Sequence, residues 1–323
     1  MALVVTPEAP VVPLPEAPGG APRRRRPRGL RGLTPYVLMV PALAALALAL
    51  GYPLVRQVAL SFQDFGLEQQ FGAPAEQVGL DNYRALLADS YLWTLVFRTV
   101  AFCLVNAGLT LVIGLAIALL LRSMSRSVRL MVQSALLLAW AMPVISAVTV
   151  WEWLFDSQYG VVNWLLTRLG GDYQGHSWLI DPLSFFLVAT LVVVWMSVPF
   201  VAFTLHAALL GVADDVVEAA EVDGAGAWQR LRHVLLPGIR PVLLVVALLQ
   251  IVWDLRVFTQ IYKLQGAGGV TRETNLLGTY IYRSGISEGE FGTAATAAIF
   301  MLALTVVLTA PYVVRMLREE RES

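Results

Sequence analysis

Few side chains in this sequence have the type and spacing that covalent chemistry needs. The three histidines, His176, His206 and His233, lie far apart, and no cluster with the spacing of metal ligands surrounds them. The one cysteine, Cys103, lies in an apolar run and is expected to be a small packing residue. The one lysine, Lys263, lacks the glycine-rich context of a Walker loop. We therefore expect no catalytic residue, no metal site, no bound cofactor and no ATP hydrolysis in this chain.

A polar stretch between two very apolar runs, Glu218–Pro241, has the pattern of a binding surface. Asp214 or Asp215 is expected to cap a short helix that runs to Asp223, with acidic side chains at its positive end. Gly224 can adopt the positive φ that a sharp turn between two helices needs. This pattern of residues predicts a helix, a turn and a second helix.

The second helix is expected over residues 225–235, and Pro237 is expected to end it and redirect the chain. Its apolar side chains recur at three- and four-residue spacing, which places them on one side: Trp228, Leu231 and Leu235. On these residues alone, an ordinary amphipathic helix that re-enters the membrane surface is an equally good interpretation.

The elements that hold this loop are apolar. The 323 residues are 57% hydrophobic and 14% charged, whereas globular proteins average roughly 45–50% and about 25%. Segments of about 20 residues are long enough to cross a hydrocarbon core of roughly 30 Å as helices. Six such segments predict an all-α membrane protein with six transmembrane helices: 35–60, 93–121, 130–151, 183–206, 241–262 and 292–314. In the second, small residues four apart predict close helix packing: Thr110, Gly114 and Ala118.

The ends of the chain have a different composition. Residues 1–33 are rich in Pro and Ala and then in Arg, which predicts a disordered basic tail. The transmembrane domain is expected over 34–315, with its polar loop at 214–240, and a short C-terminal tail over 316–323.

The arginines predict the orientation in the membrane. Fifteen lie in the tails and in the loops that share their side, whereas the opposite loops hold five basic residues, namely Arg84, Arg168, Lys263, Arg272 and Arg283. We therefore expect a multi-pass membrane protein with both termini in the cytoplasm.

The polar loop resembles a known motif. Glu218-Ala219-Ala220, three residues, Gly224, nine residues and Val234-Leu235-Leu236-Pro237 resemble the EAA loop of binding-protein-dependent ABC importer permeases, EAA-x3-G-x9-I-x-L-P. Val234 replaces the usual Ile. The sequence DGA at 223–225 and VGLDNYRALL at 78–87 resemble the carbohydrate branch of that family, and the resemblance extends from about residue 34 to the end.

The resemblance implies the type I ABC importer permease fold, a location in the bacterial cell membrane and a set of partners. These are a second EAA-type permease subunit, forming a heterodimer, a dimer of cytoplasmic ATPase subunits that use ATP and Mg²⁺, an extracellular sugar-binding protein, the sugar itself and membrane lipid. No nucleic acid is expected. The motif assigns coupling to the ATPase to Glu218, Ala219, Ala220, Asp223, Gly224 and Pro237. The segments DLRVFTQIY and ETNLLGTYIYRSG are similar to those of an actinobacterial subgroup that imports chitobiose-like disaccharides.

Polar and aromatic side chains inside the spans are candidates for the sugar path, because charges there are costly and sugars need both kinds of contact. They are Asn106, Trp195, Gln250, Trp253, Asp254 and Arg256. The alternative is structural: an Asp254–Arg256 ion pair, helix–helix hydrogen bonds, and packing by the tryptophans. Glu152, between two tryptophans, is expected at the membrane interface.

Three other functions stay open at this point. An ABC permease for a non-sugar solute would keep the EAA loop. An ion-coupled secondary carrier would place acidic residues on several spans, whereas these spans carry little more than Asp254. A membrane enzyme would need a nucleophile and a base together, and the sequence contains no such arrangement.

Overall fold

The structure is a computed structural model that describes residues 34–322, so the predicted tail over 1–33 lies outside the described residues. The chain divides into two units, Met1–Leu54 and Val55–Ser323. The described part of the first unit begins the first membrane span. It contains α1 (Thr34–Leu46), the π-helical turn η1 (Ala47–Gly51) and the start of α2 (Tyr52–Ser61).

A proline follows the π-helical turn in this first span. Pro53 has no N–H, and its ring would clash with the carbonyl of the residue four positions earlier in a regular α-helix. The wider turn of η1 directly precedes it and accommodates the ring, so the helix continues to Ser61.

The second unit contains the remaining elements. Its one sheet among the described residues is a ribbon of two antiparallel strands, β1 (Gln63–Asp64) and β2 (Glu76–Gln77). Its helices on the N-terminal side are α3 (Leu67–Gln70), α4 (Asp81–Ala88), α5 (Ser90–Ser123), α6 (Arg126–Trp140), α7 (Val144–Leu154), α8 (Val161–Arg168) and α9 (Pro182–Leu210). Those that follow are α10 (Asp214–Val222), α11 (Ala227–Arg230), the π-helical turn η2 (Leu231–Leu235), α12 (Leu236–Leu255), α13 (Thr259–Gly266), α14 (Thr271–Thr274), α15 (Leu277–Tyr282), the π-helical turn η3 (Arg283–Ser287) and α16 (Phe291–Glu322).

The structure has the predicted number of six membrane spans when a bent pair of helices is counted as one span. Within residues 34–322, five helical stretches are long and apolar enough to cross a membrane, and α6 with α7 forms a sixth candidate bent by 99°. The prediction of one continuous helix over 130–151 is therefore wrong. Pro143 explains the bend, because proline lacks an N–H and pushes the preceding residue out of the helical region.

The predicted fifth span, 241–262, also differs from the structure. The candidate stretch is longer, from Ala227 to Gly266. Within it, α12 ends at Leu255, and three irregular residues separate it from α13. The apolar character continues across this break, which is why hydrophobicity alone did not reveal it.

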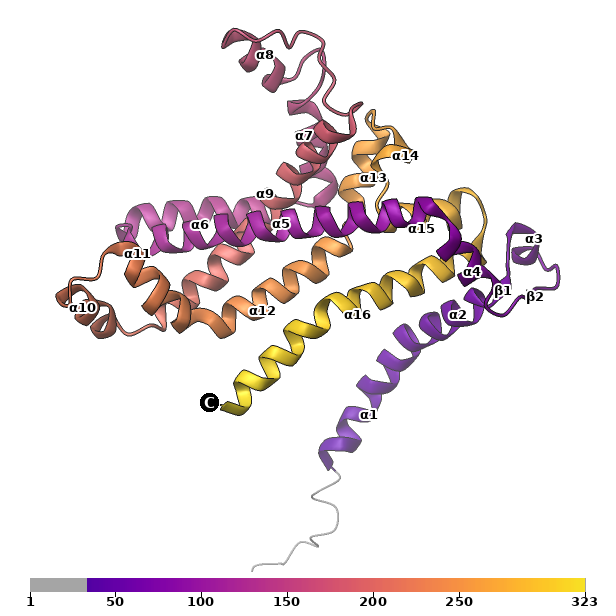
Figure 1. Ribbon diagram of the computed structural model, residues 1–323, viewed down its shortest axis with the longest axis horizontal. Helices are drawn as coiled ribbons and strands as arrows, with labels where there is room; N and C mark the ends of the chain where they lie inside the picture. The colour runs from indigo at the N-terminus through magenta and orange to yellow at the C-terminus, as the bar shows by residue number, and fades with distance from the viewer. Residues whose placement is uncertain (1–33, 323) are drawn as a thin grey trace, which may run out of the picture. The chain divides into compact units, whose positions relative to one another are not determined.

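The core of the unit is the contact between α5 and α9, which run side by side (Figure 1). The predicted small-residue face is confirmed, because Thr110, Gly114 and Ala118 are all buried. A Cβ atom on Gly114 would lie 2.6 Å from Val201 Cγ1, so only glycine permits this approach. His206 of α9 lies 3.3 Å from the Ala118 carbonyl oxygen.

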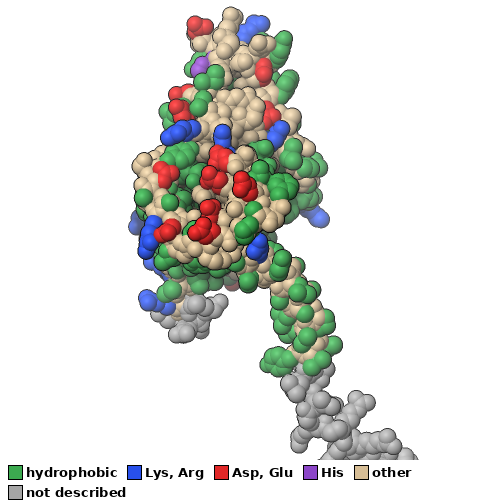
Figure 2. All heavy atoms as spheres, turned by 90° about the vertical axis from the view of Figure 1, so that its right-hand side faces the viewer, with side chains coloured by type: hydrophobic (Ala, Val, Ile, Leu, Met, Phe, Trp, Pro, Cys, Tyr) green, Lys and Arg blue, Asp and Glu red, His purple; other side chains and the backbone are tan. Residues whose placement is uncertain are grey.

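The two ends of this bundle carry different elements. Figure 1 shows α10 and α11 at one end, and α4 and α15 at the other. Acidic side chains gather on the face of the second end in Figure 2. The exposed acidic residues of the segments near it are Asp64, Glu68, Glu76, Asp81, Asp89, Glu288 and Glu290.

Candidate functional site

The polar loop folds into a helical hairpin, and its turn has the geometry predicted for it. Gly224 has φ +82°. The Ala225 N–H donates to the Ala220 carbonyl at 2.9 Å, and the Gly224 N–H donates to the Glu221 carbonyl at 3.0 Å. This pair of bonds is a Schellman motif, which ends a helix through a residue in the left-handed region. The turn that separates α10 from α11 is thus fixed by backbone bonds.

The start of α10 differs from the prediction. Its N-cap is Ala213, and no side chain caps it. Asp214 and Asp215 lie one position further on, in the first turn, where their charges still favour the helix dipole. The prediction that either aspartate caps the helix is wrong because Asp214 is bound elsewhere: its carboxylate lies 2.6 Å from Arg122 Nη2, at the end of α5.

The prediction that Pro237 ends the second helix is also wrong. α11 passes without a break through η2 into α12, and Pro237 is the second residue of α12. The π-helical turn makes room for the proline ring, as η1 does before Pro53. The hairpin's second arm is therefore the beginning of a membrane helix rather than a hinge leading to it.

The predicted apolar stripe is confirmed and lines a groove. Trp228, Leu231 and Leu235 share one side of the second arm. They face Leu119 of α5 and Val217 of α10 around a groove of about 570 Å³. A second ion pair, Arg230 to Glu221 at 2.5 Å, ties the two arms together.

The outer surface of α10 remains open. Glu218, Ala219 and Asp223 are exposed, and Ala220 is half-buried. Val222 is 88% exposed, which is unusual for an aliphatic side chain that has no partner surface. The alanines and the exposed valine give α10 a shallow outer surface.

The predicted path residues fall into two groups. Asn106, Gln250 and Asp254 are buried, and Gln250 Nε2 donates to both Asp254 carboxylate oxygens at 3.0 Å. Asn106 donates to the Phe102 carbonyl at 2.6 Å. Gln250 Oε1 and Asn106 Oδ1 have no hydrogen-bond partner among the described residues, so this buried polar layer has acceptors to offer.

The other three predicted path residues are not fully buried. Trp253 is 44% exposed and packs on Phe200 at 5.0 Å between ring centroids. Trp195 meets Trp151 edge to face at 6.1 Å. Arg256 is exposed beyond the end of α12. Among the described residues it forms no ion pair with Asp254, so the predicted structural pair is wrong: Asp254 binds Gln250 instead.

A second polar cavity was not predicted. It has a volume of about 500 Å³ and lies among α7, α13, α14, α15 and η3. Its charged side chains are Glu152, Lys263 and Arg283. The sequence carried a signal, because the segment 262–287 holds many polar residues between two spans. Glu152 lies in a different span, more than 100 positions earlier, so the sequence does not place it beside them.

The described residues contain no group of three or more His, Cys, Asp or Glu side chains that could hold a metal ion. The hairpin presents exposed side chains, and the buried polar layer and the polar cavity contain hydrogen-bond acceptors that are unpaired within residues 34–322.

Comparison with known proteins agrees with this arrangement. Residues 110–314 match the family described as binding-protein-dependent transport system inner membrane component. The chain is 40% identical to the diacetylchitobiose uptake system permease protein DasB of Streptomyces coelicolor, over 94% of this chain and 92% of that protein. It is 33% identical to the sulfoquinovosyl glycerol transport system permease protein SmoG of Agrobacterium fabrum, over 87% and 89%.

A solved structure has the same fold. It is a bacterial ABC transporter involved in the import of the acidic polysaccharide alginate, with a TM-score of 0.73 at 23% identity. The match covers 89% of this chain and 96% of that chain. The predicted type I importer fold is confirmed.

Proposed function

Because the chain belongs to the family of inner membrane components of binding-protein-dependent transport systems, we propose that it forms half of the membrane path of an ATP-driven carbohydrate importer. As a member of this family it is a transport component rather than an enzyme, and it is a multi-pass protein of the cell membrane. In the proposal, the hairpin receives the motion of a cytoplasmic ATPase.

The observation that carries the proposal is the rigid attachment of an exposed α10. Its turn is locked by the Schellman bonds at Gly224, its first turn is bound to Arg122, and its second arm continues into α12. A push on α10 therefore moves two membrane helices as one body. The exposed residues Glu218 and Ala219, together with Asp223 and Gly224, face the ATPase in this proposal.

The solute is proposed to be a sugar without a net charge. Relatives that carry permease names for diacetylchitobiose and sulfoquinovosyl glycerol support a carbohydrate. The buried layer of Asn106, Gln250 and Asp254 supplies hydrogen bonds, and Trp253 supplies an apolar face. Diacetylchitobiose is the first candidate, because the relative named for it is 40% identical over nearly the whole chain.

The proposed complex contains three further kinds of subunit: a second EAA-type permease as a heterodimer partner, two ATPase subunits that bind ATP and Mg²⁺, and an external binding protein that delivers the sugar. Both termini and the hairpin lie in the cytoplasm. Arg122 and Arg230 near the hairpin agree with this orientation, because cytoplasmic ends of spans carry an excess of arginine.

The proposal is tested by measuring the uptake of radiolabelled diacetylchitobiose by cells in which this chain is the only permease of its kind. Uptake is expected to stop when cellular ATP is depleted and to persist when ion gradients are dissipated. The variant Glu218→Ala is expected to abolish uptake while the protein stays folded in the membrane, because Glu218 is exposed. Uptake driven by an ion gradient would instead indicate a secondary carrier, and uptake of a non-sugar solute alone would indicate another ABC permease.

A further inference from the structure

The polar cavity at the end of the bundle opposite the hairpin has no role in the coupling described above. It encloses about 500 Å³, within the range of roughly 300–1,000 Å³ that small-molecule sites occupy. The side chains that give it its chemistry are Glu152, Lys263, Gln265, Thr279, Tyr282 and Arg283.

Glu152 provides an acceptor that is not used within the chain. Its Oε1 atom is buried and has no hydrogen-bond partner among the residues that the structure describes. A buried carboxylate oxygen without a donor is costly, and native proteins usually satisfy such atoms. Glu152 lines this cavity, and a carboxylate is a strong acceptor for the hydroxyl groups of a sugar.

Two tyrosines supply flat apolar faces and hydroxyl groups. Tyr262 and Tyr282 both line the cavity, and their rings meet edge to face at 5.2 Å. Phe258 stacks on Tyr262 at 5.4 Å and holds it in place. The hydrogen bond with Tyr262 raises the pKa of Tyr282 above its ordinary value.

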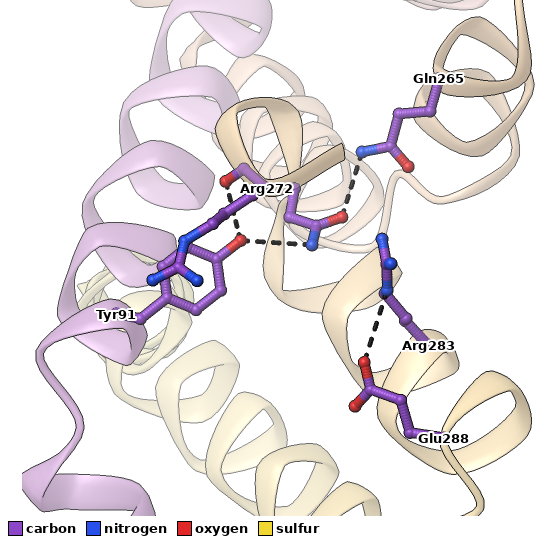
Figure 3. Close-up of polar contacts among 6 residues, drawn as sticks. Tyr91, Gln265, Arg272, Arg283 and Glu288 are labelled. Atoms are coloured by element: carbon purple, nitrogen blue, oxygen red, sulfur yellow. Dashed lines mark hydrogen bonds and ion pairs between the residues drawn. The ribbon is translucent and has the colours of Figure 1, made fainter. Parts of the chain in front are cut away.

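The cavity lining carries one negative and two positive side chains, and Glu288, which lies outside the lining, supplies the second negative charge. Arg283 Nε lies 3.4 Å from Glu288 Oε1, so its charge is partly met at the rim (Figure 3). Glu152 and Lys263 add one charge of each sign. A cavity with donors, acceptors and aromatic faces but no net charge favours a neutral, hydroxyl-rich solute over an ion.

One wall of the cavity is held rigid by α5. Figure 3 shows the chain of bonds: Gln265 Nε2 donates to Asn275 Oδ1 at 3.1 Å, and Asn275 Nδ2 donates to the Tyr91 hydroxyl at 3.3 Å. Tyr91 in turn donates to the Arg272 carbonyl at 2.8 Å. Binding groups held in this way lose little conformational freedom when a ligand binds.

We propose that this cavity is a second carbohydrate site, which holds a neutral sugar unit before the sugar reaches the buried layer around Gln250. This inference rests on the proposed import of carbohydrate and on the external position of this end of the bundle. Glu152 accepts hydroxyl hydrogen bonds, Lys263 and Arg283 donate, and Tyr262 or Tyr282 packs against the sugar ring.

A single-cysteine experiment tests the site. In a Cys103→Ser background, which lacks any other cysteine, Ser287→Cys places a thiol at an exposed position on the cavity lining. Intact cells are treated with a membrane-impermeant maleimide, with and without diacetylchitobiose. The sugar is expected to slow labelling of this thiol. It is expected to leave Gln70→Cys unaffected, because Gln70 is exposed in α3 and does not line the cavity.

Glu152→Gln in the same background is expected to raise the sugar concentration for half-protection about tenfold, because the acceptor loses its charge and its hydrogen bond weakens. Protection that Glu152→Gln does not change would come from closure of the transporter and would overturn the assignment. Unprotected labelling in cells that accumulate the sugar would also overturn it. Absence of uptake in the parent cells would instead count against the carbohydrate function itself.

Discussion

Arg122 Nη2 lies 2.6 Å from the Asp214 carboxylate and so joins the end of α5 to the first turn of α10. The arginine side chain is 21% exposed and the aspartate 81% exposed. The bond therefore lies at the edge of the membrane bundle, where α5 is itself packed along α9. This contact connects α10 to the most extensive helix–helix contact among residues 34–322, so in the proposed function it is the route by which motion enters the membrane.

Asp214→Asn is expected to loosen α10 without unfolding the bundle. Exposed ion pairs contribute at most about 1 kcal/mol, so amide exchange in α10 should quicken by about two- to fivefold. Hydrogen exchange followed by mass spectrometry over residues 214–222 measures this. Asp215→Asn is the matched control, because Asp215 is exposed and forms no side-chain bond with the described residues. Equal exchange in the two variants would show that the Arg122 contact does not hold α10.

Gly224→Ala is expected to disturb the turn through backbone strain alone. A Cβ at Gly224 would meet nothing within 4 Å, but φ is +82°, where an L-residue costs about 1–2 kcal/mol. The measurement is co-purification with the ATPase, together with sugar uptake, and both should fall. Gly226→Ala is the control, since Gly226 has φ −66° and its added Cβ would lie 3.8 Å from Gln229 Oε1. Normal assembly of Gly224→Ala would contradict the docking role of this turn.

The elements that could be predicted from sequence are those whose cause is local. Gly224 follows a short helix and precedes another, so its left-handed conformation could be predicted from glycine chemistry. The face of Thr110, Gly114 and Ala118 could be predicted as well, because small residues four apart permit close helix contact whichever helix is the partner.

One of the features that were missed depends on a partner distant in the sequence, and the others depend on the local course of the helix. Asp214 does not cap α10 because Arg122, 92 positions earlier, binds it. Asp254 binds Gln250 rather than Arg256 because residues four apart in a helix share a face, whereas residues two apart do not. Pro237 does not break the second arm because a π-helical turn absorbs it. The helix bends at Pro143 but continues through Pro237. The helix propensity of proline is the same at both positions and does not distinguish these outcomes.

Asp254→Ala is expected to lower both stability and uptake. Gln250 would keep a buried amide without its acceptor, which costs about 1–3 kcal/mol. The thermal unfolding midpoint in detergent should fall, whereas Arg256→Ala, at an exposed position, should leave it unchanged.

A double variant separates structure from transport in this buried layer. Gln250→Leu with Asp254→Leu removes both partners, which is expected to restore stability to near the parent value. If the pair lines the sugar path, uptake stays low in this stable protein. Normal uptake in the double variant, or in Asp254→Ala, would remove both residues from the path.

Gly114→Ala is expected to destabilise the α5–α9 interface by about 1–3 kcal/mol, the usual cost of overpacking a core. The added Cβ would lie 2.6 Å from Val201 Cγ1 and 3.3 Å from the Ala202 backbone nitrogen, and the backbone cannot yield easily. Gly108→Ala in the same helix is the control, since its Cβ would meet nothing within 4 Å. Thermal unfolding should show a loss for Gly114→Ala only. Val201→Ala added to Gly114→Ala removes the 2.6 Å contact but keeps the Val201 Cβ atom, which would lie 2.9 Å from the added Cβ, so it should recover only part of that loss. No recovery at all would place the cause of the defect at the Val201 Cβ and the Ala202 backbone rather than at the Val201 methyl group.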